Sequence, residues 1–443
     1  MQRSRNQQVL DEMASRIRSG ELSAGTRLPT HRELARQHGI ALETATRIYR
    51  KLTHMGLVVG EAGRGTYVRD QLGYDGLEPT RRLPVPLYAD LSVNEPLAPG
   101  QVDQLRQALK QLAGAGNLDA LLYQQPPGGR VQDRRVVATY LLSRGIDVPP
   151  ANVLITNGSQ QGLDAALEAT TGPGDLIAID SLSYPGMRML AESRKHDFAP
   201  VPVSPDGPDL DALERACRSR QVRAIYTEPT MHNPLSWVLS IEQRERIVEI
   251  ARMADAYIIE DGTYAFLAPD APPPIQALAP ERTVYVASLS KNLATGLRFG
   301  YLVAPEELIV RLRSGLRAST YGSPSIVTSL AVGWLADGTV ERMEEERRID
   351  ARRRQAVVRA VLRDYEMVSH PSSYIVWLLL RPGQRMDAVA AALAERGILV
   401  GTADRYATDG HPPHALRIAI GTPPLELLVD ALGIVQATLD SIG

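Results

Sequence analysis

The residue with the clearest chemical potential is Lys291, which follows the apolar run TVYVAS in the stretch SLSKNLATGLR. A lysine at the end of a strand can form an imine with an aldehyde, and it stays reactive when its neighbours lower its pKa. Ser288, Ser290 and Arg298 flank it, and the guanidinium fork of Arg298 suits a phosphate dianion. This stretch therefore indicates a site for an aldehyde that carries a phosphate.

Polar residues that follow other apolar runs suit a pyridine ring. Asp261 follows AYIIE, and an acid buried against a pyridine nitrogen keeps that nitrogen protonated, which makes the ring an electron sink. Asn233 and Tyr264 can each hydrogen-bond a phenolic oxygen, and Tyr184 can stack on a flat ring. Together these residues predict a phosphorylated pyridine aldehyde.

A phosphate seat is expected after the run VLIT, where Gly158 and Ser159 open a helix. Free N–H groups and the positive end of the helix dipole attract a phosphate there. Each candidate also has a plainer explanation: a surface lysine, an acid that caps a turn, core tyrosines, or an arginine in a salt bridge. Their order at consecutive strand ends favours one joint site, because ligands gather at the carboxyl ends of strands in open α/β sheets.

The elements that would position these residues form an α/β fold. The runs VLIT, LIAID, RAIYT, AYIIE and TVYVAS read as short strands, mostly separated by segments that can hold a helix. That pattern predicts a mainly parallel sheet. From about residue 340 a long charged helix is followed by a mixed α+β region. We interpret the arginines at 352–354 in that helix as a solvated face, because acids are interleaved with them.

The first 70 residues predict three helices and a hairpin. Thr30 is expected to cap the second helix, with Glu33 completing a capping box. The third helix is expected to start near Glu43 and to bury a stripe at helical spacing. That stripe consists of Ala45, Ile48, Tyr49 and Leu52. The stretch LVVGEAGRGTYV predicts two strands around a Gly-rich turn.

Helix, turn, helix and hairpin in this order predict a winged helix-turn-helix, with a small helical interaction module as the alternative. Its third helix would present hydroxyls and arginines to the major groove, and glycines would let the wing approach DNA. The charge agrees, because residues 1–70 carry 12 Lys and Arg against 7 Asp and Glu, while the remainder carries 37 against 44. The expected DNA-binding residues are Thr30, Arg32, Thr44, Thr46, Arg47, Arg64 and Gly65.

Composition places the chain as a whole among globular proteins, with 44% hydrophobic and 23% charged residues in 443. No apolar run of membrane length and no signal peptide is evident, so we expect a soluble cytoplasmic protein without membrane contact. We expect no metal site. The predicted organisation is a DNA-binding domain at 1–70, a linker at 71–88 and a larger unit at 89–443. The larger unit would divide into subdomains at about 120–330 and 331–443.

The head resembles the GntR-type winged helix, through SGELSAGTRLPTHRELARQHGI, ETATRIYRKLTHMGLV and GRGTYV. The larger unit resembles a fold-type I aminotransferase of class I/II, through SLSKNLATGLRFGY, IIEDGTY, HNP and TNGSQQGL. This resemblance implies pyridoxal 5′-phosphate (PLP) as cofactor, with Lys291 as its imine-forming lysine. It also implies that Gln160 joins the phosphate cradle, that Tyr123 reaches the neighbouring subunit's phosphate, and that Arg417 clamps a substrate or effector α-carboxylate.

The combination resembles MocR-type transcriptional regulators. It implies a homodimer that binds operator DNA and senses an amino acid or amine through an external aldimine that displaces Lys291. The alternative is a working aminotransferase with an accessory DNA-binding head, because nothing needed for half-transamination is missing. The complete head favours the regulator, and residual transaminase chemistry stays open.

Overall fold

The structure is a computed structural model of the chain, and it describes residues 5–18, 21–22, 26–54, 57–61, 65–68, 85–95, 100–114, 118–219 and 221–442. The chain divides into two compact units. One comprises Met1–Ala89 with Ala391–Leu399, and the other comprises Asp90–Ala390 with Val400–Gly443.

The N-terminal head has the predicted order of elements. Thr30 caps the second helix: its hydroxyl accepts a hydrogen bond from the Glu33 N–H at 3.3 Å, and the Glu33 carboxylate accepts one from the Thr30 N–H at 2.7 Å. The capping box is therefore confirmed. The elements are α1 (Arg5–Arg18), α2 (His31–His38), α3 (Leu42–His54), β1 (Val58–Glu61) and β2 (Gly65–Val68).

The core of the head forms on the predicted face of α3. The side chains of the stripe are at most 3% exposed, and they pack with Leu10, Met13 and Leu34 from the other two helices. The hairpin also gains a partner that the sequence did not indicate. The Leu28 N–H donates to the Thr66 carbonyl at 2.8 Å, so the segment before α2 pairs with β2.

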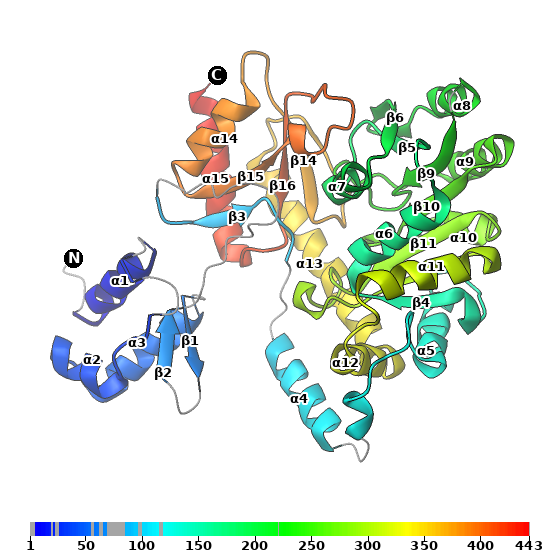
Figure 1. Cartoon of the computed structure of the whole chain (residues 1–443). Coiled ribbons are helices and arrows are strands. Elements are labelled where there is room, and N and C mark those ends of the chain that lie inside the picture. The colour runs from blue at the N-terminus through cyan, green and yellow to red at the C-terminus, as the bar shows by residue number, and fades with distance from the viewer. Residues whose placement is uncertain are drawn as a thin grey trace. The chain divides into compact units, whose positions relative to one another are not determined.

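The central element of the larger unit is a seven-stranded sheet in the order β4-β12-β11-β10-β9-β5-β6 (Figure 1). All of its neighbouring strands are parallel except β12, which runs antiparallel to both β11 and β4. The mainly parallel sheet is thus confirmed. Its strands are β4 (Val153–Thr156), β5 (Leu176–Asp180), β6 (Asp197–Val201), β9 (Val222–Thr227), β10 (Tyr257–Asp261), β11 (Thr283–Ser288) and β12 (Gly300–Val303).

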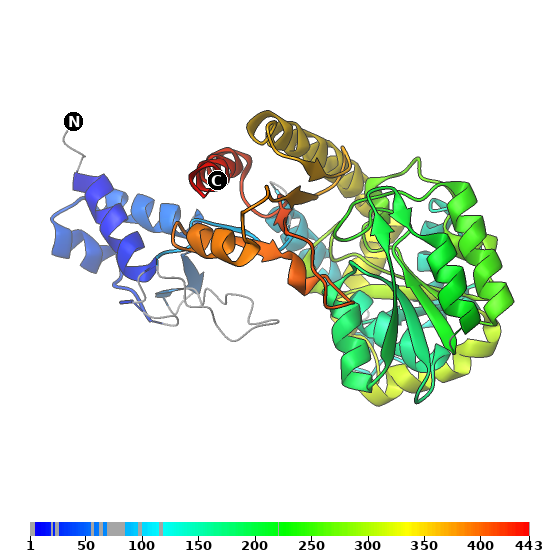
Figure 2. The same ribbon diagram turned by 90° about the horizontal axis from the view of Figure 1, so that it is seen from above.

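Helices cover both faces of this sheet (Figures 1 and 2). On one face, side chains of α6 (Gly158–Thr170), α7 (Pro185–Arg194) and α11 (Glu306–Ser319) pack on the strands. The helices packed on the opposite face are α5 (Val131–Leu142), α8 (Leu210–Ser219), α9 (Ile241–Ala254), α10 (Ile275–Leu278) and α12 (Ser325–Ala336). Both faces are buried, which explains the continuous apolar strands.

A second, five-stranded sheet follows the long helix α13 (Thr339–Val361) and has the order β13-β14-β16-β15-β3. Its edge strand β3 (Ala89–Leu91) comes from the region directly after the predicted linker. The other strands are β13 (Met367–Val368), β14 (Ile375–Leu379), β15 (Ile398–Thr402) and β16 (Ala415–Ala419). The remaining elements are α4 (Gln101–Gly114), α14 (Met386–Ala394), α15 (Leu425–Ser441) and the short pair β7 (Val203–Ser204) and β8 (Gly207–Pro208). None of the helices in the described part of the chain is long and apolar enough to cross a membrane.

The interpretation of the arginines at 352–354 as a solvated face is confirmed for the exposed Arg352 and Arg353 but is wrong for Arg354. Arg354 is only 7% exposed. It pairs with Asp350 at 2.7 Å and donates to the carbonyl groups of Ile420 and Pro423. Interleaved acids in the sequence did not reveal this, because the carbonyl acceptors lie more than 60 residues away.

Candidate functional site

The predicted site residues follow strands whose carboxyl ends lie at one edge of the seven-stranded sheet. Strands β4, β5, β9, β10 and β11 run in the same direction, since β12 is antiparallel to both of its neighbours. Their following loops hold, in turn, Gly158, Tyr184, Asn233, Tyr264 and Lys291. The topology therefore gathers these five residues at the position where open α/β sheets bind ligands.

Lys291 is half-buried, and its Nζ donates to the carbonyl oxygen of Asn94 at 2.7 Å. The same segment also meets the predicted carboxylate clamp, because Nη1 of Arg417 donates to the carbonyl oxygen of Ser92 at 2.9 Å. The segment Ser92–Glu95 thus holds both cationic groups. Sequence reasoning did not find it, since Asn94 and Lys291 are 197 residues apart.

Asp261 is buried at the end of β10 and accepts two hydrogen bonds. The Tyr226 hydroxyl donates to its Oδ2 at 3.1 Å, and the Thr263 N–H donates to its Oδ1 at 2.8 Å. Burial raises the pKa of Asp261, while these hydrogen bonds oppose the rise. Within the described residues no lysine or arginine lies within 4 Å of its carboxylate. A protonated pyridine nitrogen would supply the missing partner.

At the expected phosphate-binding site, Gly158 lies in close contact with the guanidinium group of Arg298. A Cβ on Gly158 would lie 2.9 Å from Nη2 of Arg298, and Gly158 has a φ of +77°. The exposed Arg298 forms no hydrogen bond or ion pair with any described residue, so its fork is free for a ligand. Ser290 is 6% exposed, and its Oγ has no partner in the described structure.

Two further cradle residues also lie near this seat. Ser288 is buried at the end of β11, and its Oγ accepts from the Ser290 N–H at 3.4 Å. Ser159 is half-buried in the first turn of α6, whose N-cap lacks a side-chain hydrogen bond. Free donors, a positive helix end and an unpaired guanidinium fit a phosphate dianion.

Gln160 and Tyr184 form a pair beside the seat. The Tyr184 hydroxyl donates to Oε1 of Gln160 at 3.1 Å, and Nε2 of Gln160 donates to the Gly186 carbonyl at 2.9 Å. Burial, together with the charge of Asp261, raises the pKa of Tyr184. The Gln160 side chain therefore orients the predicted stacking ring.

Asn233, in the loop after β9, and Arg417, on β16 of the second sheet, come together. Nε of Arg417 donates to Oδ1 of Asn233 at 3.1 Å, and the Arg417 guanidinium lies 5.6 Å from the centre of the Tyr406 ring. Because Oδ1 is engaged, Nδ2 is the Asn233 atom that can donate to a phenolic oxygen. Tyr264, the other predicted partner of that oxygen, is also buried.

Tyr123 stands apart from these residues. Tyr123 is 71% exposed, beside Leu122 at 87%, and among the described residues its only hydrogen bond is the one that its carbonyl accepts from the Ser325 hydroxyl. An exposed tyrosine that follows an exposed leucine is available to another molecule.

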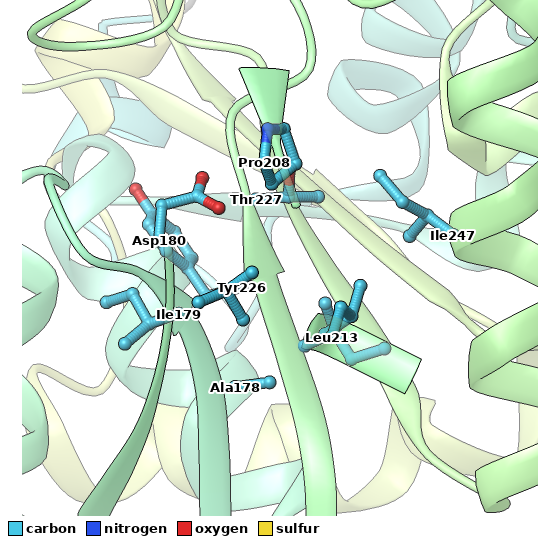
Figure 3. A pocket seen from close by; sticks show the side chains of 10 residues that line it. Ala178, Ile179, Asp180, Pro208, Leu213, Tyr226, Thr227 and Ile247 are labelled. Atoms are coloured by element: carbon cyan, nitrogen blue, oxygen red, sulfur yellow. The ribbon is translucent and has the colours of Figure 1, made fainter. Parts of the chain in front are cut away.

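Two buried acids near the site were missed by sequence reasoning. Glu228, at the end of β9, accepts from the Asn233 N–H at 3.3 Å, and its Oε1 has no partner in the described structure. Asp180, at the end of β5, lies 3.6 Å from Nε2 of His232. Burial raises the pKa of Asp180 to about 8 and, with the charges of Asp261 and Asp180, raises that of Glu228. Figure 3 shows Asp180 and Thr227 at these adjacent strand ends; the sequence signal was again their position after an apolar run.

The predicted DNA-binding residues differ in the exposure of their side chains and in the hydrogen bonds that these side chains already make. Arg32 and Arg47 are exposed, with Arg47 3.7 Å from Glu43. The hydroxyls of Thr30 and Thr46 are engaged within the head, the latter donating to the Leu42 carbonyl at 3.0 Å. Thr44 is half-buried.

The wing is described only in part, because Arg64 lies outside the described residues. Gly65, which has a φ of +124°, lies against Arg27: a Cβ on it would be 2.9 Å from Nε of Arg27. The exposed Arg27 is therefore a cation beside the wing that the sequence did not single out.

Comparison with known proteins gives two matches to family models. Residues 88–432 match "Aminotransferase class I and II", and residues 5–68 match "Bacterial regulatory proteins, gntR family". The chain is 26% identical over 431 residues to the uncharacterized HTH-type transcriptional regulator YdeF of Bacillus subtilis, covering 96% of this chain and 92% of the relative.

Two other similarities are to a regulator that matches most of the chain and to an aminotransferase. The HTH-type pyridoxine biosynthesis transcriptional regulator PdxR of Corynebacterium glutamicum is 26% identical over 411 residues, covering 90% of this chain and 88% of the relative. The crystal structure of an archaeal alanine:glyoxylate aminotransferase superposes with a TM-score of 0.75 at 25% identity, covering 81% of this chain and 92% of that one.

Proposed function

The chain belongs to the aminotransferase class I and II family, and from this membership we propose that it is a PLP-dependent transcriptional regulator that senses an amino acid or amine. The observation that carries the proposal is the fusion within one chain. A GntR-type DNA-binding domain at residues 5–68 precedes the PLP-binding fold, and relatives that share both parts over most of their length have names of regulators.

PLP is the cofactor of this fold, and the residues at the strand ends suit it. When bound, it supplies an aldehyde that captures a primary amine and a ring that withdraws electrons. Lys291 would hold the aldehyde carbon, and Asp261 would hold the proton on the ring nitrogen. Asn233 and Tyr264 would bind the phenolic oxygen, and Tyr184 would stack on the ring. The phosphate would be held by Gly158, Ser159, Gln160, Ser288, Ser290 and Arg298.

The effector would be recognised at its two ends. Its amine competes with Lys291 for the aldehyde, and its carboxylate pairs with the buried Arg417. Both cations are hydrogen-bonded to the segment Ser92–Glu95 in the present structure. An effector that engages Arg417 and releases Lys291 must therefore change the contacts of that segment. Because the segment directly follows β3 and the predicted linker, it is the shortest covalent route from the site towards the head.

A homodimer completes the proposal. Tyr123 would cross to the partner's phosphate, which accounts for a large aromatic side chain that is 71% exposed on its own chain. Operator binding by two heads would follow from the same symmetry, since dimeric helix-turn-helix proteins read paired half-sites.

A working aminotransferase is the second candidate function. One observation supports it: Arg417 is hydrogen-bonded to Asn233, and Asp261 ends the strand next to the one that Lys291 follows, so the residues that transfer of an amino group would need are present. It is less favoured than regulation because it leaves the DNA-binding head without a role.

Footprinting on the upstream region of the chain's own gene tests the proposal. Holoprotein is expected to protect a paired site, and adding candidate amino acids and amines should change that protection. Lys291→Ala should bind DNA but lose the response, whereas the control Lys110→Ala, an exposed lysine on α4, should behave like the wild type. A full response in Lys291→Ala, or no protection by the wild type, would contradict it. Catalytic turnover with a 2-oxo acid would instead support the second candidate.

A further inference from the structure

A cavity lies where the segment before α5 meets the exposed side of α11. Its volume is about 540 Å³, which lies in the range of pockets for small organic ligands. The segment before α5, which lines the cavity, pairs with the edge of β4, because the Ile155 N–H donates to the Gly128 carbonyl at 2.9 Å. None of the residues that line the cavity belongs to the proposed PLP or DNA-binding sets.

Four arginines line this cavity, and none forms an ion pair with an acid in the part of the chain that the structure describes. They are Arg130, Arg134, Arg313 and Arg317. The nearby acid is Asp133, which accepts from the backbone N–H of Arg130 and attracts its charge. The cavity therefore carries an excess of positive charge.

Among the arginines that line the cavity, Arg134 is buried, with only 7% of its surface exposed. Its Nη1 donates to the Pro150 carbonyl at 2.9 Å, but its buried Nε has no partner among the described residues. Burial lowers the pKa of Arg134, and the like charge of Arg313 adds to this effect. A buried guanidinium donor beside a second cation is costly unless an anion compensates it.

The other cations leave room for such an anion. Arg313 makes no hydrogen bond with any described residue, and within the same part of the chain Nη2 of Arg317 donates only to the Tyr321 hydroxyl, at 3.2 Å. Arg130 is also the N-cap of the 12-residue helix α5 and provides no side-chain cap. The positive end of that helix adds to the field of the guanidinium groups.

We propose that this cavity binds a small phosphorylated metabolite, with its phosphate on Arg134 and Arg313 and its carbon part against Val131 and Val310. Guanidinium forks bind phosphate oxygens in pairs, which suits a dianion better than a single carboxylate. Because Arg134 is recessed, a terminal phosphate on a small molecule reaches it, whereas the backbone of a DNA duplex is too bulky to enter. The site is independent of the amine chemistry at Lys291 and would give the protein a second ligand.

Titration calorimetry with PLP-loaded, full-length protein tests this proposal, using inorganic pyrophosphate as the probe. The loaded cofactor keeps pyrophosphate out of the phosphate seat near Arg298. The test variant is Arg313→Gln, which sacrifices no hydrogen bond to a described residue. The control is Arg311→Gln, an exposed arginine on the same helix that does not line the cavity.

The wild type and Arg311→Gln are expected to bind pyrophosphate with the same affinity. Arg313→Gln should bind it about ten-fold more weakly, as expected for one lost hydrogen-bonded charge. Cofactor absorption should be equal in all three proteins, which separates this result from any failure of the PLP site. The absence of saturable binding, or equal affinities for both variants, would overturn the proposal. So would displacement of pyrophosphate by an unrelated DNA duplex, because that would identify a surface for nucleic acid.

Discussion

At the scale of single residues, three buried acids lie at neighbouring strand ends, and only one of them has a proposed partner. Burial raises the pKa values of Asp180, Glu228 and Asp261, and the charge of Asp261 also raises that of Glu228. Neutral acids add no negative charge to the site. A buried carboxyl group of this kind ionises when a cation binds beside it. In our proposal that cation is the protonated ring nitrogen of PLP beside Asp261.

Asp180 makes this argument testable through the pH dependence of stability. Its pKa is about 8 in the folded chain against an ordinary value of 3.8, so the folded state binds the proton more strongly. Stability should consequently fall as pH rises through that interval. Asp180→Asn should make this fall less steep, by at most about 1.4 kcal/mol per pH unit.

Denaturant unfolding at several pH values within the interval measures this effect. Asp197→Asn is the matched control, because Asp197 is an exposed acid at the start of the neighbouring strand β6. A residual slope is expected in Asp180→Asn, since Glu228 and Asp261 titrate in the same direction. Parallel curves for the wild type and Asp180→Asn would show that Asp180 does not hold a proton in the folded protein.

At the scale of elements, the strands and their ends could be predicted, but the contacts between distant segments could not. The runs VLIT, LIAID and TVYVAS coincide with β4, β5 and β11, because strands buried on both faces are continuously apolar. Residues directly after those runs, such as Lys291, could be found from position and chemistry. The role of Asn94 could not be predicted. Its contact with Lys291 is made by a backbone carbonyl, which every residue type has.

The prediction at this scale concerns α3, the expected recognition helix. Arg47 is exposed on it and makes only a long contact with Glu43, so its guanidinium is available to DNA. Arg47→Ala should weaken operator binding about ten-fold or more, as for an arginine that contacts a base edge or phosphate. Fluorescence anisotropy over a range of salt concentrations measures this. Glu12→Gln, which alters an exposed acid on α1, should not weaken binding, and unchanged affinity in Arg47→Ala would remove Arg47 from the interface.

At the scale of the whole molecule, cofactor retention should depend on a second copy of the chain. If Tyr123 reaches the partner's phosphate, Tyr123→Phe should weaken PLP binding about ten-fold, the effect of one hydrogen bond to a charged group. Equilibrium dialysis of PLP measures it. Tyr257→Phe is the control, because Tyr257 starts β10, at the opposite end of that strand from Asp261. Equal retention in both variants would indicate a site complete within one chain.

The segment Ser92–Glu95 has a consequence for the concentration of effector that the protein can detect. The carbonyl of Ser92 already accepts a hydrogen bond from Arg417, so the carboxylate of an incoming amino acid must compete with the chain's own backbone. Such internal competition lowers apparent affinity by the fraction of molecules in which the segment has withdrawn. The detection threshold is thereby set by the protein as well as by the chemistry of the amine. A regulator built in this way ignores trace amounts and answers only when its signal becomes abundant.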